Sequence, residues 1–163
     1  MRAWKPSVTV ASVIHQDDRF LLVEEETSEG IRFNNPAGHL DPGESLVQAV
    51  IRETLEETAY RFVPQSLLGV YMSRYLSSRT GQDVTYLRFA FTGTVSGHDP
   101  MRPLDTGILR AVWMTLEEIK AISHLHRSPL VMRSIEDCLA GVRHPLDALH
   151  ADPSVFLAGP GAH

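Results

Sequence analysis

The chain has 163 residues and a formal net charge of −5 at pH 7, and 43% of its residues are hydrophobic. These values predict one globular domain with a single core. The acidic excess argues against an extended surface for a nucleic-acid backbone, because such surfaces need clustered Lys and Arg. No apolar run of about 18 residues and no signal peptide occurs, so we expect a cytoplasmic protein without membrane contact. Cys138, the single cysteine, is expected to pack rather than to form an internal disulfide.

The N-terminal part of the chain is predicted to form a β-hairpin. Residues 7–14 are rich in Val, and a polar turn at 16–18 separates them from a second apolar segment at 19–25. A polar loop is expected over residues 26–30. Residues 33–37 are expected to lead into a turn at Gly38.

A helix is predicted from about Ser45. Ser45 and Gln48 have the spacing of a capping box, and Pro42 and Gly43 form an entry turn directly before it. Leu46, with the apolar residues that follow at helical spacing, faces a core.

The other side of this helix gathers carboxylates. At about 100° per residue, Glu53, Glu56 and Glu57 fall within an arc of about 100°. Such a cluster favours a hard divalent cation or raised carboxyl pKa values, and a solvated amphipathic helix is the alternative. Arg52 can fix one Glu by a charge-assisted hydrogen bond, and the carbonyl of Gly38 can point at the same cation. These neighbours favour a metal site for Mg²⁺, with Mn²⁺ as a second candidate.

The C-terminal half is predicted to hold further strands and helices. The expected strands are residues 67–76, 84–95 and 108–114, with a flexible loop at 77–83. Thr115 and Glu118 have capping-box spacing and open one helix. Ser128-Pro129 opens a last helix that ends near Ala140.

One segment resembles a known family signature. Gly38, five residues, Glu44, seven residues and then Arg52-Glu53-Thr54-Leu55-Glu56-Glu57 resembles the Nudix box, which marks hydrolases of nucleoside diphosphates linked to another moiety. All five charged positions are present. The resemblance implies an α/β (α+β) fold, the Nudix-type αβα sandwich with a mixed β-sheet. We expect this single domain over residues 1–141, and a tail over 142–163 that either packs locally or stays flexible.

The resemblance also implies roles for the charged residues of the box. It implies a divalent metal bound by Glu53 and Glu57, with Glu56 as a further ligand or water holder and the Gly38 carbonyl completing the shell. It implies orienting roles for Glu44 and for Arg52 beside the metal.

Two residues are candidates for the base that removes a proton from the attacking water. Glu53 is one, because its place beside Arg52 would fix its orientation. Asp105 is the other, because many Nudix enzymes take a base from a loop in about this position. Asp105 also reads as an ordinary turn residue two positions before Gly107, and neighbouring Thr106 can be the position that is acidic in relatives. Both candidates stay open.

The box departs from the family pattern at two positions. Ala59 stands where the family has Gly, and Thr54 stands where it has an aliphatic residue. Ala at 59 matters only if the backbone there needs a positive φ, which costs Ala about 1 kcal/mol or more. We expect an altered helix end with the chemistry retained.

Four residues are candidates for substrate binding. Arg88 shares one face of its strand with Tyr86 and would bind phosphate or form an internal salt bridge. Phe33 and Tyr75 would stack on a base or pack in the core. Arg32 is a further phosphate candidate. His39 is expected to serve turn packing, because an oxygen-preferring metal does not need it.

Short segments outside the box resemble the phosphatase NudJ branch of the family. They are residues 5–11, 23–25, 35–40, 87–89 and 127–131. The resemblance implies hydrolysis of nucleoside diphosphates and triphosphates, of hydroxymethylpyrimidine pyrophosphate and of thiamine pyrophosphate. One alternative is a pyrophosphohydrolase for RNA 5′ ends or dinucleoside polyphosphates, and another is a ligand-sensing Nudix domain without turnover. The expected partners are small phosphorylated substrates, bound by a monomer or homodimer.

Overall fold

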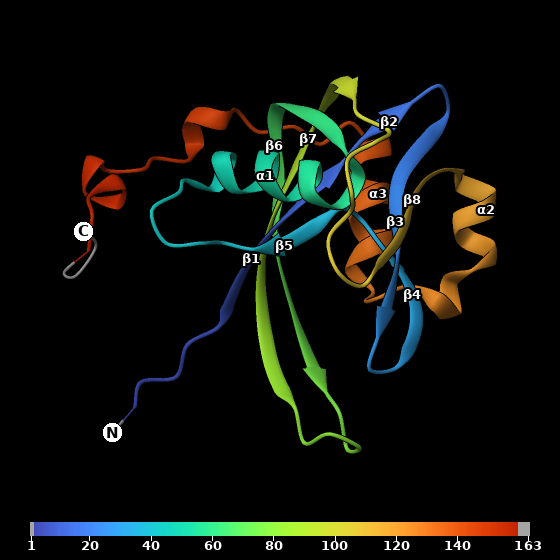
Figure 1. Cartoon of the computed structure of the whole chain (residues 1–163), viewed down its shortest axis with the longest axis horizontal. Coiled ribbons are helices and arrows are strands. Elements are labelled where there is room, and N and C mark those ends of the chain that lie inside the picture. Colours follow the sequence, from blue (N-terminus) through green and yellow to red (C-terminus); the bar gives the residue numbers. More distant parts are fainter. Residues whose placement is uncertain (1, 160–163) are drawn as a thin grey trace.

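Two β-sheets form the centre of the molecule, with helices on both sides (Figure 1). The structure, a computed structural model, describes residues 2–159. Within these residues each sheet has four strands. The mixed α+β architecture expected from the Nudix resemblance is confirmed.

The first sheet has the strand order β5-β1-β7-β6. Its strands are β1 (Ser7–Val13), β5 (Ala37–His39), β6 (Tyr60–Leu76) and β7 (Asp83–His98). The β1–β7 pair is parallel, whereas β1–β5 and β6–β7 are antiparallel, so the sheet is mixed. The β6–β7 pair extends well beyond the body of the domain as a long hairpin (Figure 1).

The second sheet is antiparallel and is centred on β3. Its strands are β2 (His15–Gln16), β3 (Arg19–Thr27), β4 (Gly30–Asn34) and β8 (Ile108–Thr115). The turn between β2 and β3 holds Asp17 and Asp18, both with positive φ. Asp tolerates this conformation better than most residues, which explains the tight reversal.

The helices begin at the caps that the sequence indicates. They are α1 (Leu46–Thr58), α2 (Leu116–Ala121) and α3 (Leu130–Leu139). Capping boxes at Ser45 and Thr115 are both formed, as predicted. Short 3₁₀ turns follow at η1 (Ser123–Leu125), η2 (Leu146–Ala148) and η3 (Pro153–Phe156). None of the helices in residues 2–159 is long and apolar enough to cross a membrane.

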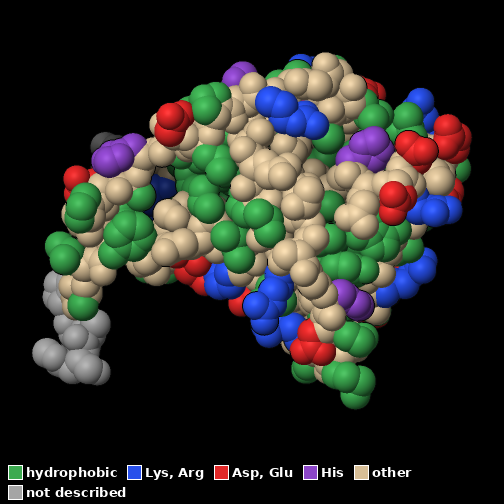
Figure 2. All heavy atoms as spheres, turned by 90° about the horizontal axis from the view of Figure 1, so that it is seen from above, with side chains coloured by type: hydrophobic (Ala, Val, Ile, Leu, Met, Phe, Trp, Pro, Cys, Tyr) green, Lys and Arg blue, Asp and Glu red, His purple; other side chains and the backbone are tan. Residues whose placement is uncertain are grey.

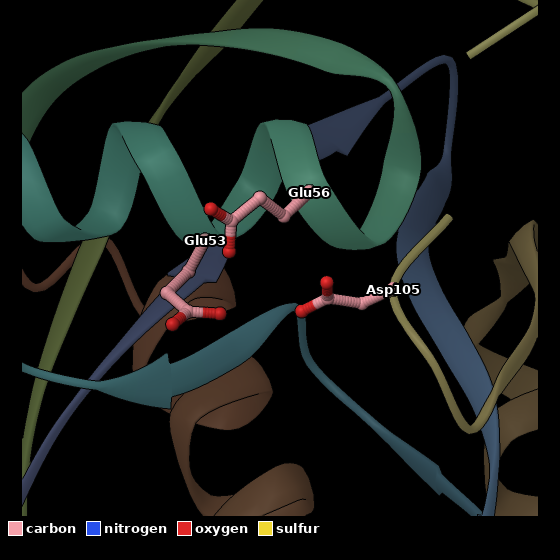
Figure 3. Close-up of side chains that lie close together, drawn as sticks. All are labelled: Glu53, Glu56 and Asp105. Carbon is pink, nitrogen blue, oxygen red and sulfur yellow. The ribbon is translucent and has the colours of Figure 1, made fainter. Parts of the chain in front are cut away.

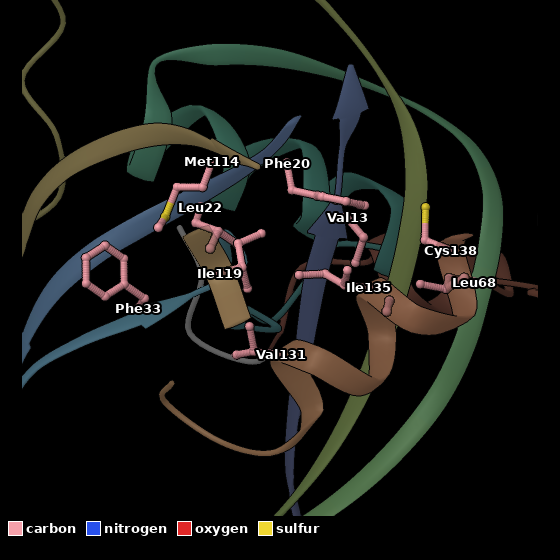
Figure 4. Packing of buried hydrophobic residues seen from close by; sticks show 11 residues of the cluster. Val13, Phe20, Leu22, Phe33, Leu68, Met114, Ile119, Val131, Ile135 and Cys138 are labelled. Atoms are coloured by element: carbon pink, nitrogen blue, oxygen red, sulfur yellow. The ribbon is translucent and has the colours of Figure 1, made fainter. Parts of the chain in front are cut away.

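Neighbouring residues on the strands supply two separate cores. Phe91 of β7 packs toward α1, whereas Ala90 packs toward the side that α2 and α3 cover. Leu67 and Leu68 of β6 divide in the same way. This division follows from side chains alternating between the two faces of a strand. In the second core, Ile119 from α2 and Ile135 from α3 meet residues of both sheets (Figure 4).

Three local expectations from the sequence are wrong. The loop expected at 26–30 is mostly strand, because β3 continues to Thr27 and β4 starts at Gly30. The turn expected at Gly38 is instead strand β5, and residues 33 and 34 before it belong to β4. Strand β6 begins at Tyr60 rather than at residue 67 and contains Pro64. A proline is tolerated there because β6 is an edge strand with register shifts.

The segment after α3 packs on the domain as far as the structure describes it. The backbones of Leu67 and His144 exchange hydrogen bonds of 2.9 and 2.8 Å. Leu146 and Leu149 pack against the core below α1. Residues 160–163, the end of the expected tail, and residue 1 lie outside the described residues.

Candidate active site

Helix α1 carries the carboxylates of the site. Its N-cap Ser45 accepts a hydrogen bond from the backbone of Gln48, and the Gln48 side chain accepts one from the backbone of Ser45. Ala49 and Val50 are fully buried against the sheet, which fixes the rotation of the helix about its axis. That rotation directs Glu53 and Glu56 toward the loop that follows β7 (Figure 3).

Glu53, Glu56 and Asp105 form one acidic cluster. One carboxylate oxygen from each lies within 4.8 Å of the others, and Figure 3 shows Asp105 opposite the two helical glutamates. The loop is attached to the helix, because the backbone N–H of Asp105 donates to the carbonyl of Glu56 at 3.0 Å. The sequence left the role of Asp105 open between a base and a turn residue. The structure brings it to the cluster.

The donor set of this cluster suits a hard divalent cation. All three groups are carboxylates, which Mg²⁺ and Mn²⁺ prefer to imidazole or thiolate. Two oxygens on opposite sides of one Mg²⁺ lie about 4 Å apart, since each metal–oxygen bond is about 2.1 Å. Small rotamer adjustments would therefore allow the three residues to share one ion.

Glu57 lies next to this cluster but points to another partner. It is buried, and its Oε1 accepts a hydrogen bond of 2.9 Å from the backbone N–H of Ala37. Burial raises the pKa of Glu57 to about 8, while the Ala37 N–H opposes the shift and the charges of Glu25, Glu53 and Asp105 add to it. A nearby cation would favour the ionised carboxylate. The metal-ligand role expected for Glu57 stays a prediction.

Gly38 lies against Glu53. A Cβ atom at position 38 would overlap the carboxylate of Glu53. Strand β5 holds Gly38 in this place by pairing with β1, opposite Val10. Glycine is therefore needed at position 38 so that the Glu53 carboxylate can lie against the backbone. The role of the Gly38 carbonyl as a metal ligand stays a prediction.

Arg52 links the carboxylates around it. Its guanidinium donates to both oxygens of Glu44, at 3.0 and 2.7 Å, to Glu53 at 2.8 Å and to Glu56 at 3.1 Å. It also donates to the carbonyl of His39 at 3.0 Å. The hydrogen bond to Glu44 raises the pKa of Arg52 and lowers that of Glu44. Arg52 thus holds three acidic side chains by hydrogen bonds, whereas the orienting role in catalysis expected for it and for Glu44 stays a prediction.

Opposing effects act on the pKa of Glu53. Burial raises its pKa, and the nearby charges of Glu56 and Asp105 raise it further, whereas the hydrogen bond from Arg52 lowers it. The net direction is upward because burial contributes most. Burial has removed part of the hydration of this carboxylate. A cation that enters the cluster would therefore stabilise its ionised form.

The four substrate-binding candidates lie in different environments. Arg88 is buried and donates to the side-chain oxygens of Asn34 at 3.1 Å and Asn35 at 3.4 Å. Burial lowers the pKa of Arg88 to about 10, against the opposing charges of Glu25 and Glu57. Its hydrogen-bond partners are amides, and no ion pair of Arg88 is found among residues 2–159, so both roles that the sequence left open stay predictions.

The other three candidates are divided between the core and the surface. Phe33 is a core residue, 7% exposed, and packs in the cluster below α2 and α3 instead of presenting a free ring face. The Tyr75 hydroxyl donates to Glu29 at 2.8 Å, and Arg32 donates to the carbonyl of Ile31 at 2.8 Å. Roles for these residues in substrate binding stay predictions.

Glu25 is a residue of this region that sequence reasoning did not select. It pairs with Arg127 at 3.3 Å, and its charge acts on both Glu57 and Arg88. Burial raises its pKa, against the charge of Arg127. The signal that could have found it is an acidic residue at the end of a strand whose earlier residues are apolar.

Comparisons with known proteins agree with this geometry. A family model described as the NUDIX domain matches residues 4–134. Phosphatase NudJ of Escherichia coli strain K12 is 38% identical over 146 residues, which cover 90% of this chain and 92% of NudJ.

Solved structures share the fold. A NUDIX hydrolase from Nitrosomonas europaea is 53% identical, with a TM-score of 0.83 over 91% of this chain and 98% of that protein. A bifunctional NMN adenylyltransferase/ADP ribose pyrophosphatase from Francisella tularensis, solved with AMP and a manganese ion, is 19% identical. Its TM-score is 0.63 over 85% of this chain and 42% of that protein, which shows the fold alone. The family match and the identity to NudJ show that the chain belongs to the Nudix hydrolase family.

Proposed function

We propose that the chain hydrolyses phosphoanhydride bonds in nucleoside diphosphates and triphosphates and in small pyrophosphates, with a divalent metal as cofactor. The small pyrophosphates in this proposal are hydroxymethylpyrimidine pyrophosphate and thiamine pyrophosphate. The observation that carries the proposal is the cluster of Glu53, Glu56 and Asp105 carboxylates, the first two of which are oriented by Arg52. The identity with phosphatase NudJ over most of both chains supports the same reaction class.

Glu53 and Glu56 are the residues that would hold the metal, with Glu57 and the Gly38 carbonyl as further ligands. A bound Mg²⁺ or Mn²⁺ would neutralise phosphate charge and lower the pKa of a coordinated water. Arg52 keeps Glu53 and Glu56 in place through hydrogen bonds of 2.8 and 3.1 Å, so these carboxylates would be positioned before substrate arrives.

Asp105 is our candidate for the base. It is exposed, and no hydrogen bond or ion pair engages its carboxylate among the described residues. Glu53, in contrast, is buried, packs on Gly38 and accepts from Arg52, so its lone pairs are partly occupied. A carboxylate with free acceptor capacity is better suited to take the proton of the attacking water.

The substrate carries several negative charges, so it needs cationic groups besides the metal. Arg32 is the surface arginine among our candidates and would contact phosphate after leaving the carbonyl of Ile31. Tyr75 would contact the organic part after leaving Glu29. Arg88 would contribute without contacting the substrate. Its positive charge offsets the charges of Glu25 and Glu57, and its hydrogen bonds hold the side chains of Asn34 and Asn35.

Two other functions have less support. Pyrophosphate removal from RNA 5′ ends calls for a continuous basic surface, but on the face in Figure 2 the Lys and Arg side chains form several separate groups. A ligand-sensing domain without turnover would not need the complete set of box carboxylates, which this chain retains.

The direct test is turnover by the purified chain with Mg²⁺ or Mn²⁺. The panel holds nucleoside diphosphates and triphosphates, hydroxymethylpyrimidine pyrophosphate, thiamine pyrophosphate and triphosphorylated RNA, with phosphate and pyrophosphate measured separately. We expect release from the small substrates, its loss in Glu57→Gln, and wild-type rates in Glu136→Gln, which changes an exposed glutamate on α3.

Two results would oppose the proposal. Absence of phosphate and pyrophosphate release across the small substrates would reject it, and so would full activity of Glu57→Gln. A clear preference for the RNA would favour the RNA-directed alternative. Substrate binding without metal-dependent turnover would favour the sensing domain.

A further inference from the structure

A cavity lies at the C-terminal end of α1, and none of its lining residues belongs to the acidic cluster. Its volume is about 260 Å³, and its wall includes Leu55 of the helix, the C-cap residue Ala59 and His98 at the end of β7. Arg61 and Arg102 also line it. The segment that connects β7 to β8 passes this end of the helix on its way to Asp105 (Figure 1).

The two arginines of the cavity are free to bind a ligand. Arg61 and Arg102 are exposed, and neither makes an ion pair or a side-chain hydrogen bond with any of residues 2–159. Arg52, Arg74 and Arg110, in contrast, are each paired with a carboxylate. Two guanidiniums in one cavity repel each other unless an anion lies between them.

The end of the helix does not account for these arginines. Cations near a helix C-terminus can satisfy its last carbonyl groups. Here backbone N–H groups bond three carbonyls at this end of the helix, since Ala59 donates to Leu55 at 2.9 Å, Asp105 to Glu56 at 3.0 Å and Asp99 to the cap residue Ala59 at 3.0 Å, and neither arginine side chain donates to a backbone carbonyl of residues 2–159. The guanidiniums of Arg61 and Arg102 therefore do not cap the helix and remain available to a ligand.

The remaining polar groups of the cavity are held in place. The ring of His98 stacks on Tyr60, with ring centroids 4.1 Å apart and an angle of 22° between the planes. The carboxylate of Asp99 accepts a hydrogen bond of 3.1 Å from the backbone of Met101. Asp99 is thus the one carboxylate among the lining residues, and it shares the cavity with two guanidiniums.

We propose that this cavity is a binding site for a phosphate group, held between Arg61 and Arg102. Guanidinium groups match the geometry of phosphate oxygens and form charge-assisted hydrogen bonds with them. The site is separate from the acidic cluster and needs no metal. Inorganic phosphate and the phosphate of a nucleoside monophosphate share this chemistry.

The cavity is connected to the acidic cluster through the chain. Arg102 donates its backbone N–H to Asp99 at 3.1 Å, and Asp105 lies three residues further on, bonded to Glu56. A phosphate held by Arg102 would restrain the segment that carries Asp105. This consequence rests on the proposed function, whereas phosphate binding itself does not.

The test is phosphate binding by the full-length protein after removal of divalent metals by chelator and dialysis. Without metal the acidic cluster repels phosphate, so binding there does not interfere. We expect orthophosphate binding by calorimetry, about 10-fold weaker in Arg61→Gln and in Arg102→Gln. Arg19→Gln, which removes another exposed arginine without an ion pair among residues 2–159, should bind like the wild type.

Asp99→Asn should change the affinity for orthophosphate in the opposite direction. It removes the negative charge of the cavity and retains the acceptor for Met101, so binding should become tighter by a factor of about 3. A merely damaged fold would not bind phosphate more tightly. Wild-type affinity in the Arg61→Gln/Arg102→Gln double variant would overturn the proposal, as would absence of binding by the wild type. Repeating the titration with AMP separates the sources, because tighter binding of AMP than of orthophosphate assigns the site to a nucleotide phosphate.

Discussion

Gly38 and Glu53 occupy adjoining space, with the backbone of one against the carboxylate of the other. No side chain at position 38 fits without displacing Glu53. The glycine of the box and its first helical glutamate, fifteen positions apart in the sequence, are therefore one packing unit.

Gly38→Ala should displace the Glu53 carboxylate and weaken metal binding. We expect kcat/KM to fall by about 100-fold, as for other misplaced catalytic groups, with a smaller loss of stability. Calorimetric titration with Mn²⁺ and steady-state kinetics measure the two effects. Gly97→Ala is the control, because a Cβ there meets nothing within 4 Å. Unchanged metal affinity in Gly38→Ala would contradict the packing argument.

Ala59→Gly should stabilise the protein. Ala59 ends α1 with a φ of 61°, a left-handed conformation that favours glycine. Loss of a buried methyl group offsets part of the gain, so we expect the free energy of unfolding to rise by about 0.5–1 kcal/mol. Urea unfolding measures it. Ala140→Gly, at the end of α3 with a φ of −72°, should instead destabilise, and equal effects of the two changes would refute the reasoning.

Thr54→Val should destabilise the protein although the two side chains have almost the same shape. The hydroxyls of Ser12 and Thr54 are hydrogen-bonded at 2.8 Å and buried, so the valine leaves Ser12 without a partner. We expect a loss of about 1–3 kcal/mol. Adding Ser12→Ala should recover most of it. A double-mutant cycle from urea unfolding checks the coupling, and strictly additive losses would show that the hydrogen bond does not matter.

Glu57 should make the metal-free protein less stable as pH rises. Its pKa is raised from an ordinary value of 4.5 to about 8, so between these values the native state holds a proton that the unfolded chain has lost. Stability from this group is complete below pH 4.5 and is lost as pH rises through about 8.

Glu57→Gln is the matching variant, because the amide oxygen can still accept from Ala37. At pH 8 without metal it should be more stable than the wild type by on the order of 2 kcal/mol, and the difference should vanish near pH 4.5. Thermal unfolding across this range measures it. A difference that stays constant with pH would exclude Glu57 as the titrating group.

Asp105→Asn should separate proton removal from metal binding. If Asp105 is the base, kcat falls by about 10²–10⁴-fold and Mn²⁺ affinity changes much less. Glu53→Gln should lower both kcat and Mn²⁺ affinity, because Glu53 is the buried member of the acidic cluster. The converse pattern, with metal affinity lost mainly in Asp105→Asn, would make Asp105 a ligand and return Glu53 to the role of base.

Local features of the sequence determined the elements around the site. The capping boxes at Ser45 and Thr115 and the apolar face of α1 depend on residues within a few positions of one another. The same is true of the common direction of Glu53 and Glu56, which follows from helical geometry alone. The amino-acid sequence by itself is therefore enough to identify the box.

Other features depended on partners far away in the chain. Strands β4 and β5 are only five and three residues long and exist because β3 and β1 pair with them. Strand β6 continues through Pro64 because the edge of a sheet tolerates a missing donor. The sequence offered no local signal for any of these.

The site itself shows the same division. The sequence determined the helical carboxylates, whereas the approach of Asp105 to them depends on a hydrogen bond between the loop and Glu56. Likewise, the burial of Arg88 and the packing of Phe33 follow from neighbours on other strands and on α2 and α3. Periodicity and capping act over one or two helical turns, but burial and charge pairing are set by distances in space, which only the folded chain decides.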